Sequence, residues 1–347
     1  MENSRYTRNR RREQERIRQR KAARRFLLLV LLLLIAAAFA VYFFVFRDHE
    51  LNLTKAYDPA DQVFGINQVE LSPSQASGFA SGLCVANEDY NPNEISLAAG
   101  AAGLFSEDTH ETLYAKSVHE RMYPASLTKI MTCLVALKYG NLDDVVTVGQ
   151  ECYNIASDSS VANIIPGDQL TLRELLYGLM INSGNDAGMS IAVYIAGSVD
   201  AYVDLMNQEA AAIGATNTHF MNPHGLHDEN HYTTVYDVYL MFHEALKYTD
   251  FQEIIGMHNY YITIPNIDGT SRDVVWESTN YYSNGNATAP GDVQVVGGKT
   301  GTTSEAGACL CLYSKDRYGS PYISIIMNAA THDDLYSQMN VLLREIP

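Results

Sequence analysis

Three short motifs determine which distant parts of this 347-residue chain must meet when it folds: Ser126-Leu-Thr-Lys129, Ser183-Gly-Asn185 and Lys299-Thr-Gly301. Each motif alone is expected by chance in a chain of ordinary composition, so the information lies in their order and in their flanking residues. Two serine hydroxyls, two amines and an amide spread over more than half of the chain act together only in a fold that brings the three segments to one place.

The first motif lies at the start of a predicted helix. Apolar residues recur at spacings of three and four from Ser126 to Tyr139, after Pro124 and before Gly140. Ser126 and Lys129 would then share one face of the first helical turn. A serine hydroxyl is a good nucleophile only beside a base, and a lysine serves as that base when burial or a nearby cation lowers its pKa. The alternative is an N-cap serine followed by a surface lysine.

The second motif follows another predicted helix. Residues 171–174 form a capping box, and the apolar stripe behind it predicts a helix that ends near Ile181. The next apolar run begins at Ala187, which places Ser183 and Asn185 in the connecting loop. Catalytic side chains often lie on such loops, although serine, glycine and asparagine also make ordinary polar turns.

The third motif, Lys299-Thr-Gly301, lies between two strand-like runs at 293–298 and 306–312, which predict an antiparallel pair. Glycines in a strand often mark a place where a ligand approaches the backbone closely. The alternative is a glycine-rich hairpin with a solvated lysine. Six strands are predicted in all, at Gly82–Ala86, Ala101–Ser106, Thr112–Lys116, Val293–Gly298, Ala308–Tyr313 and Tyr322–Met327.

With these flanks, the chain resembles the D-alanyl-D-alanine carboxypeptidase family, the low-molecular-weight penicillin-binding proteins that trim peptidoglycan stem peptides. The stretches that carry the resemblance are 123–132, 175–188, 220–226 with 231–234, and 297–307. The resemblance implies an α/β fold of the β-lactamase/DD-peptidase type. In that fold an antiparallel sheet is flanked by helices, a mostly helical lobe is inserted, and the active site lies between them.

The resemblance also implies a role for each matched residue. Ser126 would attack the carbonyl between two D-alanines, with Lys129 as proton acceptor, and Ser183 would relay a proton to the leaving amine. The resulting acyl-enzyme would be hydrolysed by water without a metal or an organic cofactor, and β-lactams would acylate the same serine. The backbone N–H groups of Ser126 and Thr302 would form the oxyanion hole. The substrate-binding residues would be Asn185, Lys299, Thr300, Gly301 and Thr302.

One departure from the family concerns the terminal carboxylate of the substrate. Family members often carry an arginine shortly after the strand that follows Lys-Thr-Gly, but residues 327–334 contain none. Thr302 and Lys299 are candidates for holding the carboxylate, as are His332 and residues from elsewhere.

The N-terminal region predicts a membrane anchor. Residues 26–46 carry no charge and are long enough to span a bilayer, and residues 1–25 hold eleven basic and three acidic residues. The positive-inside rule then places the N-terminus in the cytoplasm. A cleavable signal peptide is the alternative, because Ala38-Phe-Ala40 resembles a cleavage site. Residues 47–75 are interpreted as a linker and 76–347 as one extracytoplasmic catalytic domain.

The net charge of the predicted external domain limits the kinds of partner that it can bind. Of the 24 basic and 40 acidic residues in the chain, 13 and 37 remain after residue 25, which excludes nucleic acid as a partner of the external domain. The expected partners are a stem peptide ending in D-Ala-D-Ala, β-lactams as covalent inhibitors, and the membrane through residues 26–46.

Cysteine and histidine add little chemistry. The five cysteines leave at least one unpaired within the chain, and Cys309 and Cys311 on one strand face indicate apolar packing. Histidines at 219, 224, 227 and 231 suggest a zinc cluster, but His224 and His231 fall in the family's Asn-Pro-His-Gly-Leu and His-Tyr-Thr-Thr segments. We therefore expect a turn beside the cleft and no metal site.

Three alternative functions stay open. A class A β-lactamase needs a glutamate that activates the deacylating water, and no Glu-x-x-Leu-Asn string lies between Asn185 and Lys299. Five other glutamates do occur there: Glu209, Glu229, Glu244, Glu253 and Glu277. An endopeptidase that cuts D-alanine cross-links would use the same residues as a carboxypeptidase. A penicillin-binding sensor without catalysis would retain the pocket, but the cytoplasmic part is only a short basic tail.

Overall fold

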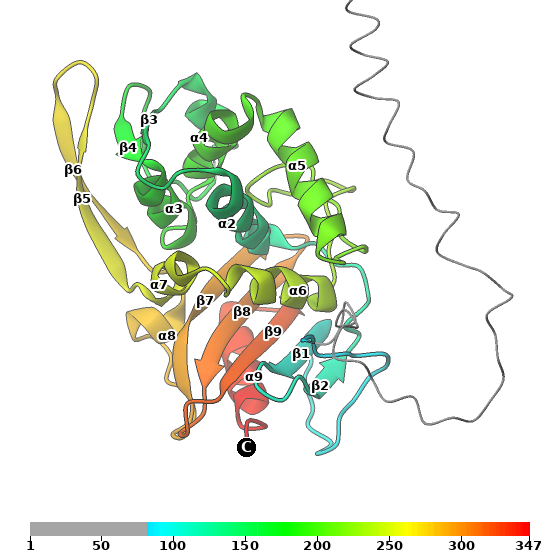
Figure 1. Cartoon of the computed structure of the whole chain (residues 1–347). Helices are drawn as coiled ribbons and strands as arrows, with labels where there is room; N and C mark the ends of the chain where they lie inside the picture. The colour runs from blue at the N-terminus through cyan, green and yellow to red at the C-terminus, as the bar shows by residue number, and fades with distance from the viewer. Residues whose placement is uncertain (1–81, 158) are drawn as a thin grey trace, which may run out of the picture. The chain divides into compact units, whose positions relative to one another are not determined.

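A five-stranded antiparallel sheet lies at the centre of the described residues of the computed structural model, which are 82–157 and 159–347. The strands follow the order β2-β1-β9-β8-β7, with β7 at one edge and β2 at the other (Figure 1). Their bounds are β1 (Ala101–Ser106), β2 (Thr112–Lys116), β7 (Gln294–Thr303), β8 (Gly307–Lys315) and β9 (Pro321–Ala329). The predictions made for residues 1–25, 26–46 and 47–75 lie outside the described residues.

Alternation along the strands places a core on each face of the sheet. In β8, Cys309 and Cys311 belong to the core on one face, whereas Leu310 and Leu312 belong to the core on the other. All five cysteines are free and buried, and the packing predicted for Cys309 and Cys311 is confirmed. This period of two is what an antiparallel strand covered on both faces requires.

Helices cover both faces of the sheet. On one face, α2 (Thr128–Tyr139) and α6 (Val235–Ala245) contribute to the same core as Cys309 and Cys311, while α9 (His332–Leu343) packs on the opposite face (Figure 1). The other helices are η3 (Ala125–Leu127), η4 (Gln150–Tyr153), α3 (Leu172–Met180), α4 (Asn185–Ala196), α5 (Val199–Ala212), α7 (Thr249–Gly256) and α8 (Tyr281–Asn284). The chain between β2 and β7 therefore forms the predicted helical lobe beside an antiparallel sheet.

Two of the six predicted strands coincide with β1 and β2, and three more overlap β7, β8 and β9, but the one at Gly82–Ala86 is wrong. The backbone there is held by side chains of α6 in place of a neighbouring strand. The Cys84 backbone N–H donates to the Tyr239 hydroxyl at 2.9 Å, and the Tyr236 hydroxyl donates to the Cys84 carbonyl at 2.8 Å. Once these groups are satisfied, the segment has no need of a ladder.

Two hairpins were not predicted. The longer pairs β5 (Asn259–Pro265) with β6 (Ser271–Glu277) and projects from the helical lobe in Figure 1. Its strands alternate between exposed and less exposed positions, and Asp268-Gly269 lies in its turn, so the sequence signal was present. The shorter pairs β3 (Val145–Thr147) with β4 (Gln169–Thr171), whose three-residue strands give too little pattern to detect.

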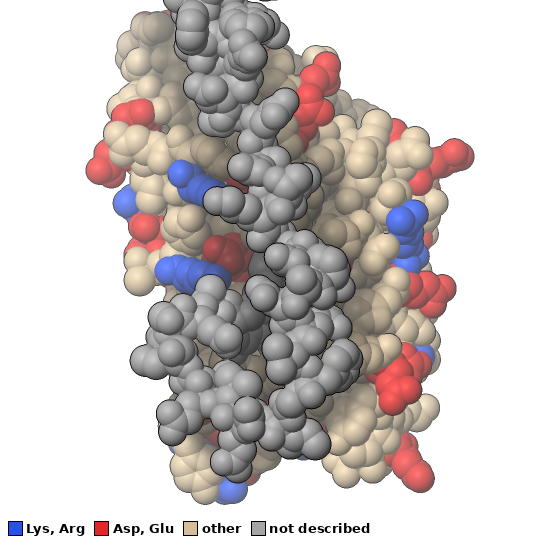
Figure 2. Space-filling model, turned by 45° about the vertical axis from the view of Figure 1, so that its right-hand side comes forward, with Lys and Arg blue, Asp and Glu red and all other residues tan. Residues whose placement is uncertain are grey.

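Acidic side chains run down the right-hand side of the face in Figure 2, in keeping with the excess of acidic over basic residues in the sequence. Within the described part of the chain, no single helix is long and apolar enough to cross a membrane. Only α4 and α5 taken together pass that test by composition, and they are bent by 85° to each other.

Candidate active site

Ser126 lies in a short turn of 3-10 helix just before α2, and not in the first turn of the α-helix as predicted. The preceding residue, Ala125, has a left-handed backbone with φ of 48°, which is unfavourable for a residue with a Cβ. Two contacts hold it there. Thr128 Oγ1 donates to the Ala125 carbonyl at 2.8 Å, and Gly225 packs directly against the same carbonyl. The nucleophile is therefore presented on a strained turn that long-range packing supports.

Lys129 is fully buried behind Ser126, and its amine touches three oxygens. The Nζ lies 2.8 Å from Ser126 Oγ, 2.7 Å from Asn185 Oδ1 and 2.9 Å from the carbonyl oxygen of His224. A neutral amine has two N–H donors, which suit Asn185 Oδ1 and the His224 carbonyl, and one lone pair, which is free to face the Ser126 hydroxyl. The i,i+3 spacing brings Lys129 to Ser126 as predicted.

The environment of Lys129 favours the neutral amine. Burial holds its pKa well below the usual value, and the positive charge of Lys299 adds to the effect, while the negative charge of Asp186 opposes it. A neutral amine within hydrogen-bond distance of a hydroxyl is able to accept its proton. The position and the protonation state of Lys129 thus both suit a general base.

Ser183 and Asn185 come from the junction between α3 and α4. Ser183 lies in the connecting turn with φ of 58°, but Asn185 is the first residue of α4 and not part of the loop. Gly184 takes the N-cap position, and the Asn185 N–H donates to the Ser160 carbonyl at 2.8 Å. The capping box predicted at residues 171–174 is confirmed, and α3 ends at the expected place.

Lys299 projects from β7 into the same site. Its Nζ lies 3.0 Å from Ser183 Oγ and 2.9 Å from the Thr300 carbonyl, and burial lowers its pKa to about 7. Lys299 therefore connects the second and third motifs and supplies the positive charge that acts on Lys129.

The Lys-Thr-Gly motif lies within β7, whereas the predicted strand ended before it. Lys299, Thr300 and Gly301 pair in register with residues of β8. A Cβ at Gly301 would lie 2.9 Å from the Ser126 backbone nitrogen, so only glycine lets the strand pass this close to the nucleophile. Thr300 Oγ1 contacts Thr279 Oγ1 at 2.5 Å, and Thr302 is exposed at the end of the strand.

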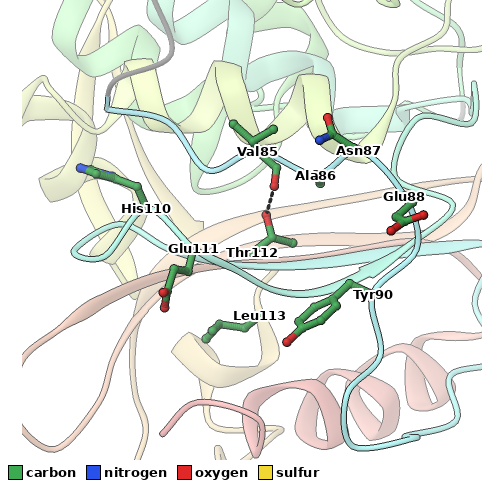
Figure 3. A pocket seen from close by; sticks show the side chains of 9 residues that line it. All are labelled: Val85, Ala86, Asn87, Glu88, Tyr90, His110, Glu111, Thr112 and Leu113. Carbon is green, nitrogen blue, oxygen red and sulfur yellow. Dashed lines mark hydrogen bonds between the residues drawn. The ribbon is translucent and has the colours of Figure 1, made fainter. Parts of the chain in front are cut away.

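Three of the predicted site residues, Ser126, Asn185 and Thr302, line a cleft of about 310 Å³, whereas Lys129, Ser183, Lys299, Thr300 and Gly301 are buried and do not line it. Its lining is mostly small and polar: Ser126, Ser159, Ser160, Asn185, His224, Gly225, Leu226, His227, Thr302, Thr303, Ser304 and Glu305. Among the described residues that line the cleft, Glu305 is the sole carboxylate, so none of the five glutamates between the second and third motifs is among them. A separate cavity of about 540 Å³ lies beside β2 at the far edge of the sheet, where Thr112 donates to Val85, and it contains none of the motif residues (Figure 3).

The sequence did not assign the backbone of residues 223–225 to the site. The His224 carbonyl accepts from Lys129, and the Pro223 carbonyl accepts from Thr132 Oγ1 at 2.6 Å. His231 Nε2 lies 2.8 Å from Thr128 Oγ1, so its imidazole supports the residue that holds the nucleophile turn. Burial lowers the pKa of His224 to about 3 and that of His231 to about 4, which keeps both rings neutral. The motif Asn-Pro-His-Gly, with a glycine at φ of 92°, was the available signal.

The two lysines predict a bell-shaped pH profile for acylation of Ser126. Acid protonates Lys129 and removes the base, so the rate should fall as the pH drops. Alkali neutralises Lys299 as the pH rises through about 7, so binding of an anionic substrate should weaken. In a Lys299→Ala variant a repulsive cation is lost, the pKa of Lys129 should rise, and the acid limb should move to higher pH. Stopped-flow measurement of penicillin acylation tests this, and an acid limb that moves to lower pH would contradict it.

Comparison with known proteins places this site in a family. The family model described as D-alanyl-D-alanine carboxypeptidase matches residues 87–331. This chain belongs to the D-alanyl-D-alanine carboxypeptidase family. The resemblance predicted from the three motifs is therefore confirmed.

Individual relatives agree with this assignment. The D-alanyl-D-alanine carboxypeptidase DacF of Bacillus subtilis is 33% identical over 272 residues, which cover 76% of this chain and 66% of that protein. The D-alanyl-D-alanine carboxypeptidase of Streptomyces sp. strain K15 is 32% identical and covers 67% of this chain and 81% of that protein. The crystal structure of the Streptomyces K15 DD-transpeptidase matches with a TM-score of 0.67 at 29% identity, over 73% of this chain and 98% of that one. The chain spans about two thirds of the length of several curated relatives it matches.

Proposed function

We propose that this chain is a serine-type D-Ala-D-Ala carboxypeptidase that removes the terminal D-alanine from peptidoglycan stem peptides and is acylated by β-lactams. One observation carries the proposal: the Lys129 amine is fully buried and lies 2.8 Å from Ser126 Oγ and 2.7 Å from Asn185 Oδ1. Membership of the family and the names of the relatives support the same activity.

In the first half of the reaction, the Ser126 hydroxyl attacks the carbonyl of the penultimate D-alanine while its proton moves to Lys129 Nζ. A C–O bond forms, and the carbonyl oxygen becomes an oxyanion that the backbone N–H groups of Ser126 and Thr302 stabilise. The C–N bond to the terminal D-alanine then breaks. The proton that Lys129 accepted passes through the Ser183 hydroxyl to the departing amine, so Lys129 is again a neutral base. Lys299 Nζ orients that hydroxyl, at 3.0 Å from Ser183 Oγ.

In the second half, water attacks the acyl-enzyme ester and gives its proton to the amine of Lys129. The C–O bond to Ser126 breaks, and the proton returns to the serine, so that the enzyme is regenerated with no net proton held. Asn185 supports both halves because its carbonyl oxygen orients Lys129. Its amide nitrogen remains to meet the substrate backbone.

A second candidate function is transpeptidation, which differs only in the acceptor. The relative of known structure from Streptomyces K15 is named a DD-transpeptidase, and in that reaction an amine replaces water as the group that attacks the acyl-enzyme. Because acylation is common to both reactions, the site residues do not separate them. Both products therefore have to be measured.

The test is release of D-alanine from a pentapeptide ending in D-Ala-D-Ala by the full-length chain, with and without an added amino-acid acceptor. A Ser126→Ala variant is the control, and a cross-linked muropeptide is a parallel substrate. Release of D-alanine that depends on Ser126 supports the carboxypeptidase. Formation of the amide with the acceptor supports the transpeptidase, and cleavage of the cross-linked substrate alone supports an endopeptidase. If neither substrate is cleaved, the proposal is wrong. Rapid hydrolysis of penicillin would also contradict it, because that result indicates a β-lactamase.

We further infer that residues 26–46 anchor the chain in the cell membrane, with residues 1–25 in the cytoplasm and the catalytic domain from residue 76 outside. The support is the uncharged length of residues 26–46 and the eleven basic residues before it. Recovery of the protein in the membrane fraction supports the anchor. A mature N-terminus just after Ala40 would show that the segment is a cleaved signal peptide.

A further inference from the structure

A substrate that ends in D-Ala-D-Ala carries a carboxylate, and the cleft offers few groups to hold it. No lysine or arginine is among the described residues that line the cleft. The two lysines behind it are engaged, since Lys129 contacts three oxygens and Lys299 contacts two. Glu305 lines the cleft and would repel an anion. The carboxylate therefore needs hydrogen-bond donors from another part of the rim.

Two exposed polar groups meet at the end of β7. Thr302 Oγ1, on the last part of the strand, lies 3.3 Å from Nε2 of His332, the first residue of α9. Thr302 lines the cleft, so His332 lies directly beside it. Two donors at this separation suit the two oxygens of one carboxylate, each donor serving one oxygen.

The His332 ring is held in place by aromatic stacking. Tyr281, from α8, stacks on His332 with ring centroids 5.9 Å apart, and Tyr336 of α9 stacks on Tyr281 at 4.5 Å. The Tyr281 backbone N–H donates to the Tyr336 hydroxyl at 2.9 Å, which fixes the middle ring. A side chain held by such packing loses less conformational freedom when a ligand binds.

We propose that His332 supplies a second hydrogen bond to the terminal carboxylate of the substrate, beside the one expected from Thr302, and so helps to select peptides with a free C-terminus. The inference rests on the proposed function, because it concerns the leaving D-alanine. Residues 327–334 contain no arginine, and in this stretch His332 is the residue that we expect to bind the carboxylate. Asp333 and Asp334 in the first turn of α9 bring negative charge close by, so at this part of the rim recognition depends on directed hydrogen bonds, which add to the positive charge of the buried Lys299.

The test compares two substrates that differ only in this group, a peptide ending in D-Ala-D-Ala and the same peptide with a C-terminal amide. For His332→Ala in the full-length chain, we expect kcat/KM for the acid to fall by about tenfold relative to the amide, through KM. His332→Arg should restore the preference for the acid. His227→Ala is the matched control, since His227 is another imidazole that lines the cleft and packs against Tyr123. Equal losses on acid and amide, or an acid-specific loss with His227→Ala instead, would overturn the proposal.

A second measurement tests the role of His332 even if the chain has no carboxypeptidase activity. If the wild-type chain releases no D-alanine, the proposed function fails, but penicillin and its methyl ester still form the same kind of pair. His332→Ala should then slow acylation by penicillin and leave acylation by the ester nearly unchanged. Equal effects on the two would overturn the role of His332. Unchanged thermal unfolding of the variant, as expected for an exposed residue, shows that the fold is retained.

Discussion

Replacement of Lys129 by alanine should lower the rate of Ser126 acylation by about a hundred- to ten-thousandfold, the usual contribution of a general base. The loss should be this large because, among the described residues, no other amine is within hydrogen-bond distance of Ser126 Oγ. The amine of Lys299 contacts Ser183 and Thr300 and so cannot replace that of Lys129. Time-resolved labelling with a fluorescent penicillin measures the rate directly. An unchanged rate would contradict the assignment of Lys129 as the base.

Two further variants separate chemistry from folding. Lys129→Ala leaves Asn185 Oδ1 and the His224 carbonyl without their donor, so some loss of stability is expected. Lys129→Gln retains an N–H donor but has no base, and it should be as slow as the alanine variant while unfolding closer to the wild type. Lys138→Ala is the matched control on the same helix, since its partly exposed amine pairs with the buried Glu209 at 2.6 Å and has no contact with Ser126. Its acylation rate should stay within about twofold of the wild type, although loss of the amine at Glu209 should lower stability.

The largest loss of stability from a single methyl group is expected for Gly225→Ala. Gly225 has φ of 92°, and an added Cβ would lie 1.8 Å from the Ala125 carbonyl oxygen. Backbone strain and the clash together should lower the free energy of unfolding by about 3–5 kcal/mol. Because Ala125 precedes the nucleophile, the acylation rate should fall as well. Urea unfolding measures the first effect, and penicillin labelling measures the second.

Gly269→Ala is the matched control for Gly225→Ala. Gly269 also has a left-handed backbone, with φ of 86°, but no atom of the described residues lies within 4 Å of an added Cβ at this turn between β5 and β6. The cost should therefore be strain alone, about 1–2 kcal/mol, with acylation unaffected. If the two variants lose equal stability, contact between Gly225 and the nucleophile turn contributes nothing.

Local pattern accounts for much of what the sequence predicted correctly. The i,i+3 spacing of Ser126 and Lys129, the capping box at residues 171–174, and the strand-like runs of β1 and β2 all depend on neighbours in the chain. The three motifs in order, together with their flanking stretches and with residues 220–226 and 231–234, were enough to identify the family. The boundaries were less well predicted, since Asn185 begins α4 and the Lys-Thr-Gly motif lies within β7.

The periodicities, the motifs and hence the kind of site follow from the order of the amino acids alone, because helix turns and strand alternation depend on residues a few positions apart. The chemistry of that site depends on how the chain packs. The lowered pKa of Lys129 results from burial and from Lys299 on a distant strand, and the strained turn at Ala125 is held by Gly225. Burial and long-range contact are properties of the packed chain, and no local pattern encodes them.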